Sequence, residues 1–397
     1  MTNKGWKIYK IDNICEVLSS KRIFAADYVK FGIPFYRSKE IIEKAFGENI
    51  SNLLYIAEEK YNDIKSKYGV PKENDILISA VGERSGIPYL VRNEEFYFKD
   101  GNLIWIRNFD DRKIFSKYLC YWFKSKIGQF TLENLMIGSA QKALTIVGIK
   151  GIELNLPPLE VQNKIAKVLS ALDNKIELNN AINNNLEQQI FTIFDNIFPN
   201  VRDGENTISN YFSPKRGKNL LSKNAILGDV PVIAGGLNPA TYHNVANTNA
   251  PVITISASGA NAGFVNLWHI PVWSSDSSYI DNTITSNIYF WYVMLKKRQQ
   301  EIFDSQTGSA QPHIYPQHIE GMTVSDIDMN LVNDFNDNVT PLFINMGENI
   351  KENQKLIQLR DTLLPKLMSG EIDVSKVEID DILTNQSADK LLFSEDK

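Results

Sequence analysis

The side chains of this sequence that could do chemistry are mainly hydrogen-bond donors and cations, in short stretches rich in Gly, Ser and Gln. Two of these stretches occur twice: residues 137–141 (IGSAQ) return as 307–311 (TGSAQ), and residues 78–82 (ISAVG) return as 255–259 (ISASG). Gly lets a backbone approach a phosphate closely, and Gln and Arg side chains match the base edges of adenine and guanine. The stretches therefore indicate nucleic-acid recognition.

The candidates for contact with DNA form two corresponding sets. The first-half set is Lys21, Arg22, Arg37, Ser79, Arg84, Ser139, Gln141 and Lys142. The second-half set is Lys215, Arg216, Ser256, Ser258, Asn261, Ser309, Gln311 and His313. Taken singly, each residue is more often a solvated surface residue or a turn former. As two matched sets, they favour recognition.

No motif of a catalytic centre is present. The sequence has no GxxxxGKS or GxxxxGKT phosphate loop, no GxGxxG after a strand, no HExxH and no CxxC. Residues 155–159 (NLPPL) lack the adjacent prolines after Asn and the aromatic side chain of the amino-methyltransferase loop. His313 and His318 flank Pro316 rather than sharing one helical face. We therefore expect no catalytic residue, no metal site and no cofactor in this chain.

Length and composition are those of an ordinary globular protein, with 397 residues, 43% hydrophobic and 22% charged, enough for two or more domains. Cys15 and Cys120 lie far apart in apolar surroundings, which favours buried reduced thiols over a disulfide framework. The sequence contains no apolar run long enough to cross a bilayer and no apolar signal region at its start. We expect a cytoplasmic location and no membrane contact.

Charge is distributed unevenly along the chain, although the net charge is -5. Residues 1–150 carry 24 basic against 18 acidic residues, and residues 199–324 carry 8 of each. The excess acid lies in residues 151–198, with 3 against 6, and in residues 325–397, with 7 against 15. A basic first globule is compatible with phosphate contact, whereas any basic patch in the second must be local.

Two long helices must position these globules. Seam residues recur at alternating spacings of four and three, which is the pattern of a heptad repeat, and the seam returns 170 residues later. The first seam is Ile165, Leu169, Leu172, Ile176, Asn179, Asn183, Leu186, Ile190, Ile193 and Ile197. The second is Phe335, Val339, Leu342, Met346, Asn349, Asn353, Leu356, Arg360, Leu363 and Leu367. Pro157 and Pro158 favour a helix start just after them.

Each seam carries a central pair of Asn residues, and polar seam positions fix helix register while weakening the pairing. If the helices lie antiparallel with their midpoints together, Asn179 faces Asn353 and Asn183 faces Asn349. All four amides could then be satisfied. The alternative is that the four residues face solvent on two ordinary surface helices.

We therefore expect a mixed α/β (α+β) protein in which a globule followed by a long helix occurs twice, with pseudo-two-fold symmetry and an antiparallel coiled coil. The expected divisions are a globule at 1–155, a central helix at 156–198, a second globule at 199–324, a second helix at 325–370 and an acidic tail at 371–397. In the first globule we expect strands at 6–17, 33–36, 75–81 and 102–107 and a helix near 118–130. Gly370 is expected to close the second helix, with Pro365 ending or bending it one turn earlier.

These features together resemble the DNA specificity subunit of type I restriction-modification systems. The resemblance covers nearly the whole chain: two globules, a central helix opening with residues 156–162 (LPPLEVQ) and a closing segment at 360–370 (RDTLLPKLMSG). Residues 325–331 depart from it, because they lack the Pro-Pro and Gln of the first copy. The start of the second helix is therefore expected to differ.

The resemblance implies a non-catalytic subunit that binds double-stranded DNA, with each globule a target recognition domain for one half of a bipartite, asymmetric site. It also implies that the helices dock two methyltransferase subunits and that restriction (motor) subunits join the complex. S-adenosylmethionine, ATP and Mg would then be bound by those partners.

Two other classes of protein stay open at this point. An enzyme with its own methyltransferase or nuclease centre would need motifs that the sequence lacks. A scaffold that uses the coiled coil only to space protein partners would not need a basic N-terminal globule. Salt-dependent binding to DNA distinguishes the scaffold from a DNA-binding protein.

Overall fold

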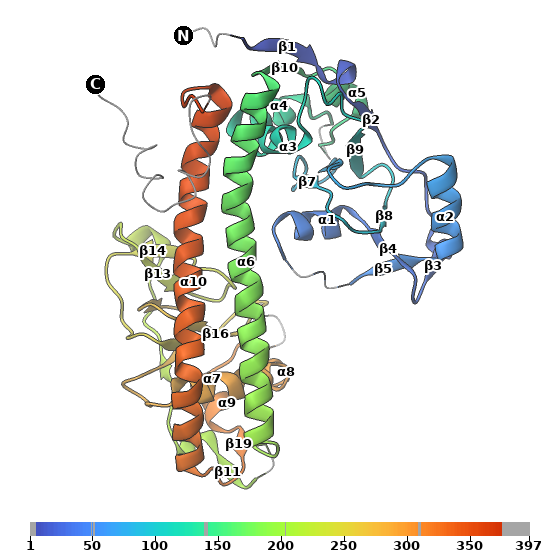
Figure 1. The fold of residues 1–397 in the computed structure, drawn as a ribbon. Helices are drawn as coiled ribbons and strands as arrows, with labels where there is room; N and C mark the ends of the chain where they lie inside the picture. The colour runs from blue at the N-terminus through green and yellow to red at the C-terminus, as the bar shows by residue number, and fades with distance from the viewer. Residues whose placement is uncertain are drawn as a thin grey trace, which may run out of the picture. The chain divides into compact units, whose positions relative to one another are not determined.

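The computed structural model describes residues 5–48, 50, 52–138, 142–202, 204–308 and 311–374. The chain forms two compact units (Figure 1). Unit 1 contains Met1–Glu177 and Gln354–Lys397, and unit 2 contains Leu178–Asn353. Helices α6 (Leu159–Ile197) and α10 (Met329–Ser369) each contribute one part to each unit.

Unit 1 contains two four-stranded sheets and a two-stranded pair. The strand order is β2-β9-β6-β7, all antiparallel, in one sheet and β3-β5-β4-β8 in the other, where only β4 and β8 run parallel. Strands β1 and β10 form the antiparallel pair. Their bounds are β1 Lys7–Lys10, β2 Glu16–Leu18, β3 Tyr28–Val29, β4 Ile33–Tyr36, β5 Leu54–Ile56, β6 Ile76–Ser79, β7 Pro88–Leu90, β8 Tyr97–Phe98, β9 Leu103–Arg107 and β10 Glu153–Leu156.

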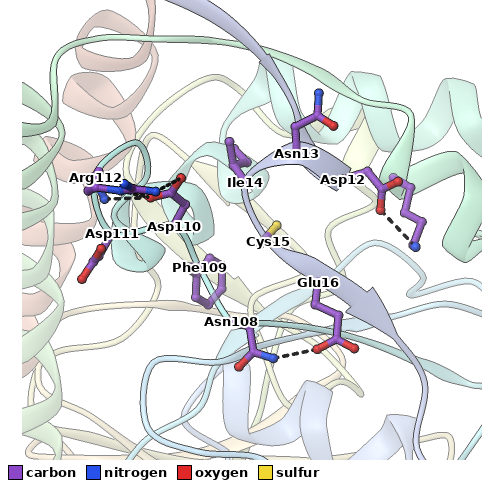
Figure 2. Close-up of a pocket in the computed structure, with 11 residues that line it drawn as sticks. Asp12, Asn13, Ile14, Cys15, Glu16, Asn108, Phe109, Asp110, Asp111 and Arg112 are labelled. Atoms are coloured by element: carbon purple, nitrogen blue, oxygen red, sulfur yellow. Dashed lines mark hydrogen bonds and ion pairs between the residues drawn. The ribbon is translucent and has the colours of Figure 1, made fainter.

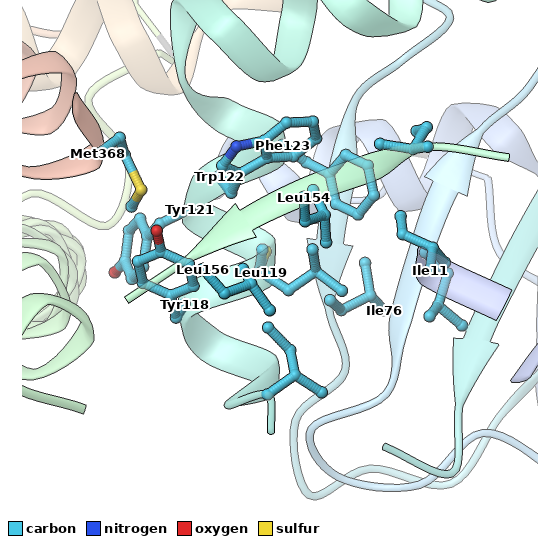
Figure 3. Close-up of a cluster of buried hydrophobic side chains, with 14 of the residues drawn as sticks. Ile11, Ile76, Tyr118, Leu119, Tyr121, Trp122, Phe123, Leu154, Leu156 and Met368 are labelled. Atoms are coloured by element: carbon cyan, nitrogen blue, oxygen red, sulfur yellow. The ribbon is translucent and has the colours of Figure 1, made fainter. Parts of the chain in front are cut away.

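The main core of unit 1 joins its first sheet to its helices. Figure 3 shows Tyr118, Leu119 and Phe123 of α3 gathered with Ile76 of β6 and Leu154 of β10. The same cluster includes buried residues of both long helices, so burial of apolar area attaches the globule to them. The helices are α1 Ser38–Ala45, α2 Glu58–Lys67, α3 Ser116–Lys124, α4 Lys126–Leu135 and α5 Ile146–Lys150, with 3₁₀ turns η1 Ile11–Asn13 and η2 Ala25–Asp27.

Two of the sequence-based expectations in this globule are wrong in detail. The expected strand at 6–17 is interrupted by η1, because the chain leaves its pairing with β10 after Lys10 and joins β9 at Glu16. The expected helix near 118–130 is two helices, α3 and α4. Ser125 divides them, since its extended backbone ends α3 while its hydroxyl accepts a hydrogen bond from Gly128 N at 3.2 Å and caps α4.

Unit 2 has a four-stranded antiparallel sheet of order β12-β18-β15-β16, a three-stranded sheet of order β14-β13-β17 and the pair β11-β19. In the three-stranded sheet, β13 runs parallel to β17. The strands are β11 Asn206–Thr207, β12 Lys215–Arg216, β13 Val230–Ile233, β14 Thr241–His243, β15 Val252–Ser256, β16 Val265–Trp268, β17 Trp273–Ser274, β18 Ser277–Asp281 and β19 Thr323–Val324.

The core of unit 2 is built around α7, whose residues 288–295 are all buried. Phe290 of α7 packs on Phe194 of α6 and Phe335 of α10, at ring-centroid distances of 5.6 and 6.2 Å. The helices and 3₁₀ turns are η3 Ile208–Asn210, η4 Ser222–Asn224, α7 Ile288–Lys297, α8 Gln299–Asp304 and α9 Pro316–Glu320.

The two long helices are continuous from end to end. Helix α10 runs through Pro365 to Ser369, so of the two expected effects of Pro365, an end or a bend of the helix, the end is wrong. Gly370 follows with a φ of +75°, a left-handed conformation that suits Gly after a helix. The apolar cluster formed by Leu363 and Leu367 with the core of unit 1 holds this last stretch of helix in place.

The starts of the two helices are built differently, as the departure at residues 325–331 predicts. Near the start of α6, the fully buried Gln162 accepts a hydrogen bond from Phe115 N at 3.0 Å and donates to Lys113 O and Pro157 O, each at 2.9 Å. In α10, Asn336 instead accepts from Tyr289 N at 3.2 Å, at the start of α7. Both side chains satisfy an amide at a helix start that lacks a partner within its own helix.

Four Asn side chains of α6 and α10 meet inside unit 2. Asn179 Nδ2 donates to Asn353 Oδ1 at 2.9 Å, and Asn349 Nδ2 donates to Asn183 Oδ1 at 2.8 Å. From the first of these pairs to the second, the residue number rises along α6, from 179 to 183, and falls along α10, from 353 to 349. The two segments are therefore antiparallel. One amide oxygen departs from the expectation of full pairing: Asn179 Oδ1 is buried without a hydrogen-bond partner, since the amide nitrogen of Asn179 is turned toward two acceptors.

Candidate nucleic-acid interface

The turn after β6 carries Arg84 at the surface of unit 1. The Ser79 hydroxyl donates to Arg84 O at 2.7 Å and accepts from Ile87 N at 2.9 Å, which closes the turn from inside. The Arg84 guanidinium is exposed and lies 4.7 Å from the ring centre of Phe46, itself 56% exposed. A cation on an exposed aromatic ring is suited to contact a phosphate or a base edge.

The turn after β15 is the corresponding feature of unit 2. Ser256 N donates to Phe264 O at 3.0 Å and Gly263 N donates to Ser256 O at 2.7 Å. The Ser256 hydroxyl makes a longer contact, 3.4 Å to Ala234 O. Both Ser79 and Ser256 are buried, so the prediction that they contact DNA is not supported by their positions. They shape the turns.

Two candidates of unit 2, Arg216 and Ser258, converge on Asp276, a residue that the sequence reasoning missed. The Arg216 guanidinium lies 2.5 Å from the Asp276 carboxylate, and the Ser258 hydroxyl donates to the same carboxylate. Ser258 also forms a β-bridge with His313, whose ring stacks on Tyr315 with centroids 5.9 Å apart. The arrangement connects the exposed Arg216, through Asp276 and Ser258, to the stacked rings of His313 and Tyr315.

The basic candidates at the start of unit 1 differ in how their charges are matched. Arg22 pairs with Asp100 at 3.1 Å, and Arg37 forms a bidentate pair with the buried Glu40, which raises the Arg37 pKa. Within the described part of the chain, no ion pair neutralises Lys21, whose ammonium lies 4.7 Å from the ring centre of Tyr68. Lys21 is therefore the cation of this group best placed for a phosphate.

The remaining candidates are exposed, partly buried or outside the described residues. Ser139, Gln141 and Ser309 fall outside the described residues. Lys142, Lys215 and Gln311 are exposed, and Asn261 is partly buried in the turn after β15, where its carbonyl accepts from Phe264 N at 3.0 Å. None of these positions on its own assigns a role.

A pocket of about 600 Å³ opens between η1 and the segment after β9 (Figure 2). Both cations that line it are paired with carboxylates of the same pocket: Lys150 with Asp12 at 3.0 Å, and Arg112 with Asp110 at 3.1 Å. Arg112 and Lys113 hold the pKa of the Asp110 carboxyl well below its usual range. A pocket of mixed and paired charge is not suited to a single anion or cation.

The Cys15 thiol, which lines this pocket, has low reactivity. Burial raises the pKa of Cys15 to about 12, so the reactive thiolate form is scarce near neutral pH. Cys120 is buried as well, in agreement with the expectation of buried reduced thiols. Among the described residues, no group of three or more His, Cys, Asp and Glu side chains is arranged to hold a metal ion. No helix in the described ranges is long and apolar enough to span a membrane.

Comparison with known protein families identifies a domain in the first half of the chain. The family model of the type I restriction modification DNA specificity domain matches residues 3–188. The chain contains a type I restriction modification DNA specificity domain. The resemblance to type I specificity subunits is thereby confirmed.

Relatives of this specificity-domain protein carry matching names. A putative type I restriction enzyme specificity subunit of Haemophilus influenzae is 30% identical over 168 residues, which is 42% of this chain and 40% of that protein. The MjaIX specificity subunit of Methanocaldococcus jannaschii is 25% identical over 306 residues, covering 66% of this chain and 71% of that one. The chain thus spans less than half of the first relative and 71% of the second.

The fold has a counterpart among solved structures. The S subunit of a type I restriction-modification system from M. genitalium superposes with a TM-score of 0.61 at 20% identity, over 92% of this chain and 97% of that one. The mixed α/β architecture expected from the sequence is therefore that of a type I S subunit.

Proposed function

We propose that this protein is the DNA-recognition subunit of a type I restriction-modification complex and that each globule reads one half of a bipartite, asymmetric site. The observation that carries the proposal is the match of residues 3–188 to the DNA specificity domain. The proposal is supported by the exposed guanidinium groups of Arg84 in unit 1 and Arg216 in unit 2, which are donors of the kind that base edges and phosphates require.

The proposal that the two globules are equivalent DNA-recognition domains is supported by a strand order and a side-chain hydrogen bond that occur in both units. The sheet orders β2-β9-β6-β7 and β12-β18-β15-β16 place the strands in the same succession. Gln129 Nε2 donates to Gly86 O at 3.0 Å in unit 1, and Gln299 Nε2 donates to Gly263 O at 2.7 Å in unit 2. We infer that the chain is an internal repeat of one globule and one helix.

In this proposal the two long helices form an antiparallel coiled coil that sets the distance between the two DNA-recognition globules. The heptad seams and the amide pairs Asn179–Asn353 and Asn183–Asn349 support it. Two methyltransferase subunits would dock on these helices, and restriction subunits would join that assembly. S-adenosylmethionine, ATP and Mg would be used on those partners.

A salt series tests the DNA-binding part of the proposal. Duplex DNA from the host should bind the purified chain with an affinity that falls steeply as salt rises, because phosphate contacts release counterions. The scaffold alternative expects no such binding. The absence of salt-dependent DNA binding, with the chain alone and with its methyltransferase subunits, would overturn the proposal.

The absence of catalysis is proposed separately. Incubation of the purified chain with DNA and labelled S-adenosylmethionine should leave the DNA unlabelled, and the label should appear only when methyltransferase subunits are added. Transfer of label by the chain alone would assign it a methyltransferase centre of its own.

A further inference from the structure

A second pocket of unit 1, of about 530 Å³, is lined by cations and aromatic rings. Lys21, Lys67, Arg107 and Lys150 contribute the cations, and Tyr68 and Trp105 contribute rings. No Asp or Glu is among the described residues that line it. This sets it apart from the pocket of Figure 2, where Asp12, Glu16 and two further Asp residues contribute to the wall.

Arg107 of the pocket wall is held in a fixed orientation. Its guanidinium bonds to Glu16 Oε2 at 2.8 Å and to Tyr68 O at 3.1 Å, and it lies 4.3 Å from the ring centre of Trp105. Gly69 makes room for it: a Cβ there would lie 2.9 Å from Arg107 Nη1, and the φ of +80° at Gly69 also disfavours other residues.

Lys21, which also lines this pocket, has a positioned backbone and a side chain that forms no ion pair among the described residues. Its backbone N–H donates to the Tyr97 hydroxyl at 2.7 Å, while its ammonium lies over the exposed ring of Tyr68. Lys67 and Lys150 each already have an acidic partner, Asp63 at 2.6 Å and Asp12 at 3.0 Å. The excess positive charge of the pocket is thus concentrated at Lys21.

We propose that this pocket binds the phosphate group of a nucleotide, with Lys21 as its principal contact and Arg107 as a second, oriented donor. An uncommitted ammonium near an oriented guanidinium suits a phosphate, and the neighbouring rings suit an attached base. The proposal rests on the proposed function where the phosphate belongs to DNA. A free nucleotide would supply the same chemistry.

The first arm of the test measures duplex DNA binding by the full chain. Lys21→Gln should lower the association constant roughly 5–10-fold at about 0.1 M salt and reduce the salt slope by about 1. Lys7→Gln, which removes the same charge from an exposed position on β1 outside the pocket, should change the affinity less than about twofold. Both side chains are exposed, so both variants should fold like the parent protein.

The second arm identifies the source of the phosphate. Thermal unfolding is followed with deoxyadenosine 5′-phosphate and, as a matched control, with deoxyadenosine lacking the phosphate. Stabilisation by the phosphate compound alone, lost in Lys21→Gln, would assign the pocket to free nucleotides. An effect of Lys21→Gln on DNA binding without such stabilisation would assign it to DNA.

The two arms separate this inference from the proposed function. If Lys21→Gln and Lys7→Gln bind DNA equally and the nucleotide gives no Lys21-dependent stabilisation, the pocket proposal is overturned while DNA recognition stands. If the parent protein binds no DNA but is stabilised by the nucleotide through Lys21, the pocket stands and the proposed function fails.

Discussion

The Ser79 hydroxyl illustrates how a single side chain shapes the turn after β6 from inside. It has a donor and an acceptor role in one buried turn, whereas Ser256 makes one long contact in the corresponding turn. Ser79→Ala should therefore lower the free energy of unfolding of unit 1 by about 1–3 kcal/mol, because it leaves buried groups unsatisfied. Ser256→Ala should cost less than about 1 kcal/mol. Urea unfolding of the two variants measures this, and equal losses would contradict the assignment.

His269 provides a pH-dependent prediction for unit 2. Burial lowers the pKa of His269 below its ordinary value of 6.5, and a Cβ at Gly347 of α10 would lie within 2.9 Å of the His269 Cβ. Above that ordinary value both folded and unfolded states are neutral at this position. As the pH falls below it, the unfolded state takes up a proton that the folded state resists, so stability falls.

The comparison with His269→Gln isolates this effect. Between pH 7.5 and 5.5, the urea midpoint of the parent protein should fall more than that of the variant. Parallel pH dependences in the two proteins would show that His269 does not contribute.

Residue types alone indicate which chemical groups the surface carries, but not which side chains pair with one another. Arg84 and Lys21 could be selected because exposed cations in Gly- and Ser-rich stretches have few structural roles. Asp276 and Arg107 could not, because their importance depends on partners distant in sequence, Ser258 and Arg216 for the first and Tyr68 for the second. Such pairs become visible only when the sheets bring them together.

At the scale of elements, the long helices were the most predictable part of the fold. A seam maintained over ten positions is a local, periodic signal, so it predicts both α6 and α10 despite Pro365. Short strands and turns depend on tertiary pairing instead. The break at Ser125 and the interruption of residues 6–17 follow from capping and from a change of partner strand, neither of which is periodic.

The amide cluster of unit 2 is expected to trade stability for a unique register. Replacing Asn179, Asn183, Asn349 and Asn353 together with Leu should raise the unfolding midpoint, since Asn179 Oδ1 is buried and unpaired. It should also allow slipped pairings of the helices, displaced by about 10 Å for one heptad.

Spin labels on Gln189 of α6 and Asp337 of α10, both exposed and both in unit 2, report this register. The parent protein should give one narrow distance distribution, and the variant should add further populations. A single unchanged distribution in the variant would show that the Asn residues do not set the register.

At the scale of the whole molecule, two readers should act on separate parts of the DNA. Arg84→Ala should relax base preference in one half of a split site by about 1–3 kcal/mol, the value of one good base contact. Arg216→Ala should act on the other half in the same way. Selection from randomised duplex DNA measures both, and a variant that alters both halves would contradict the division of labour.

The central claim, that two globules read two halves of one site at a fixed spacing, is tested most directly by methylation-sensitive sequencing of the host genome. The account predicts a methylated motif with two specified, unrelated parts separated by a constant number of unspecified bases. Removal of this chain should abolish that methylation. A continuous motif, a spacer of variable length, or methylation that persists without the chain would contradict the account.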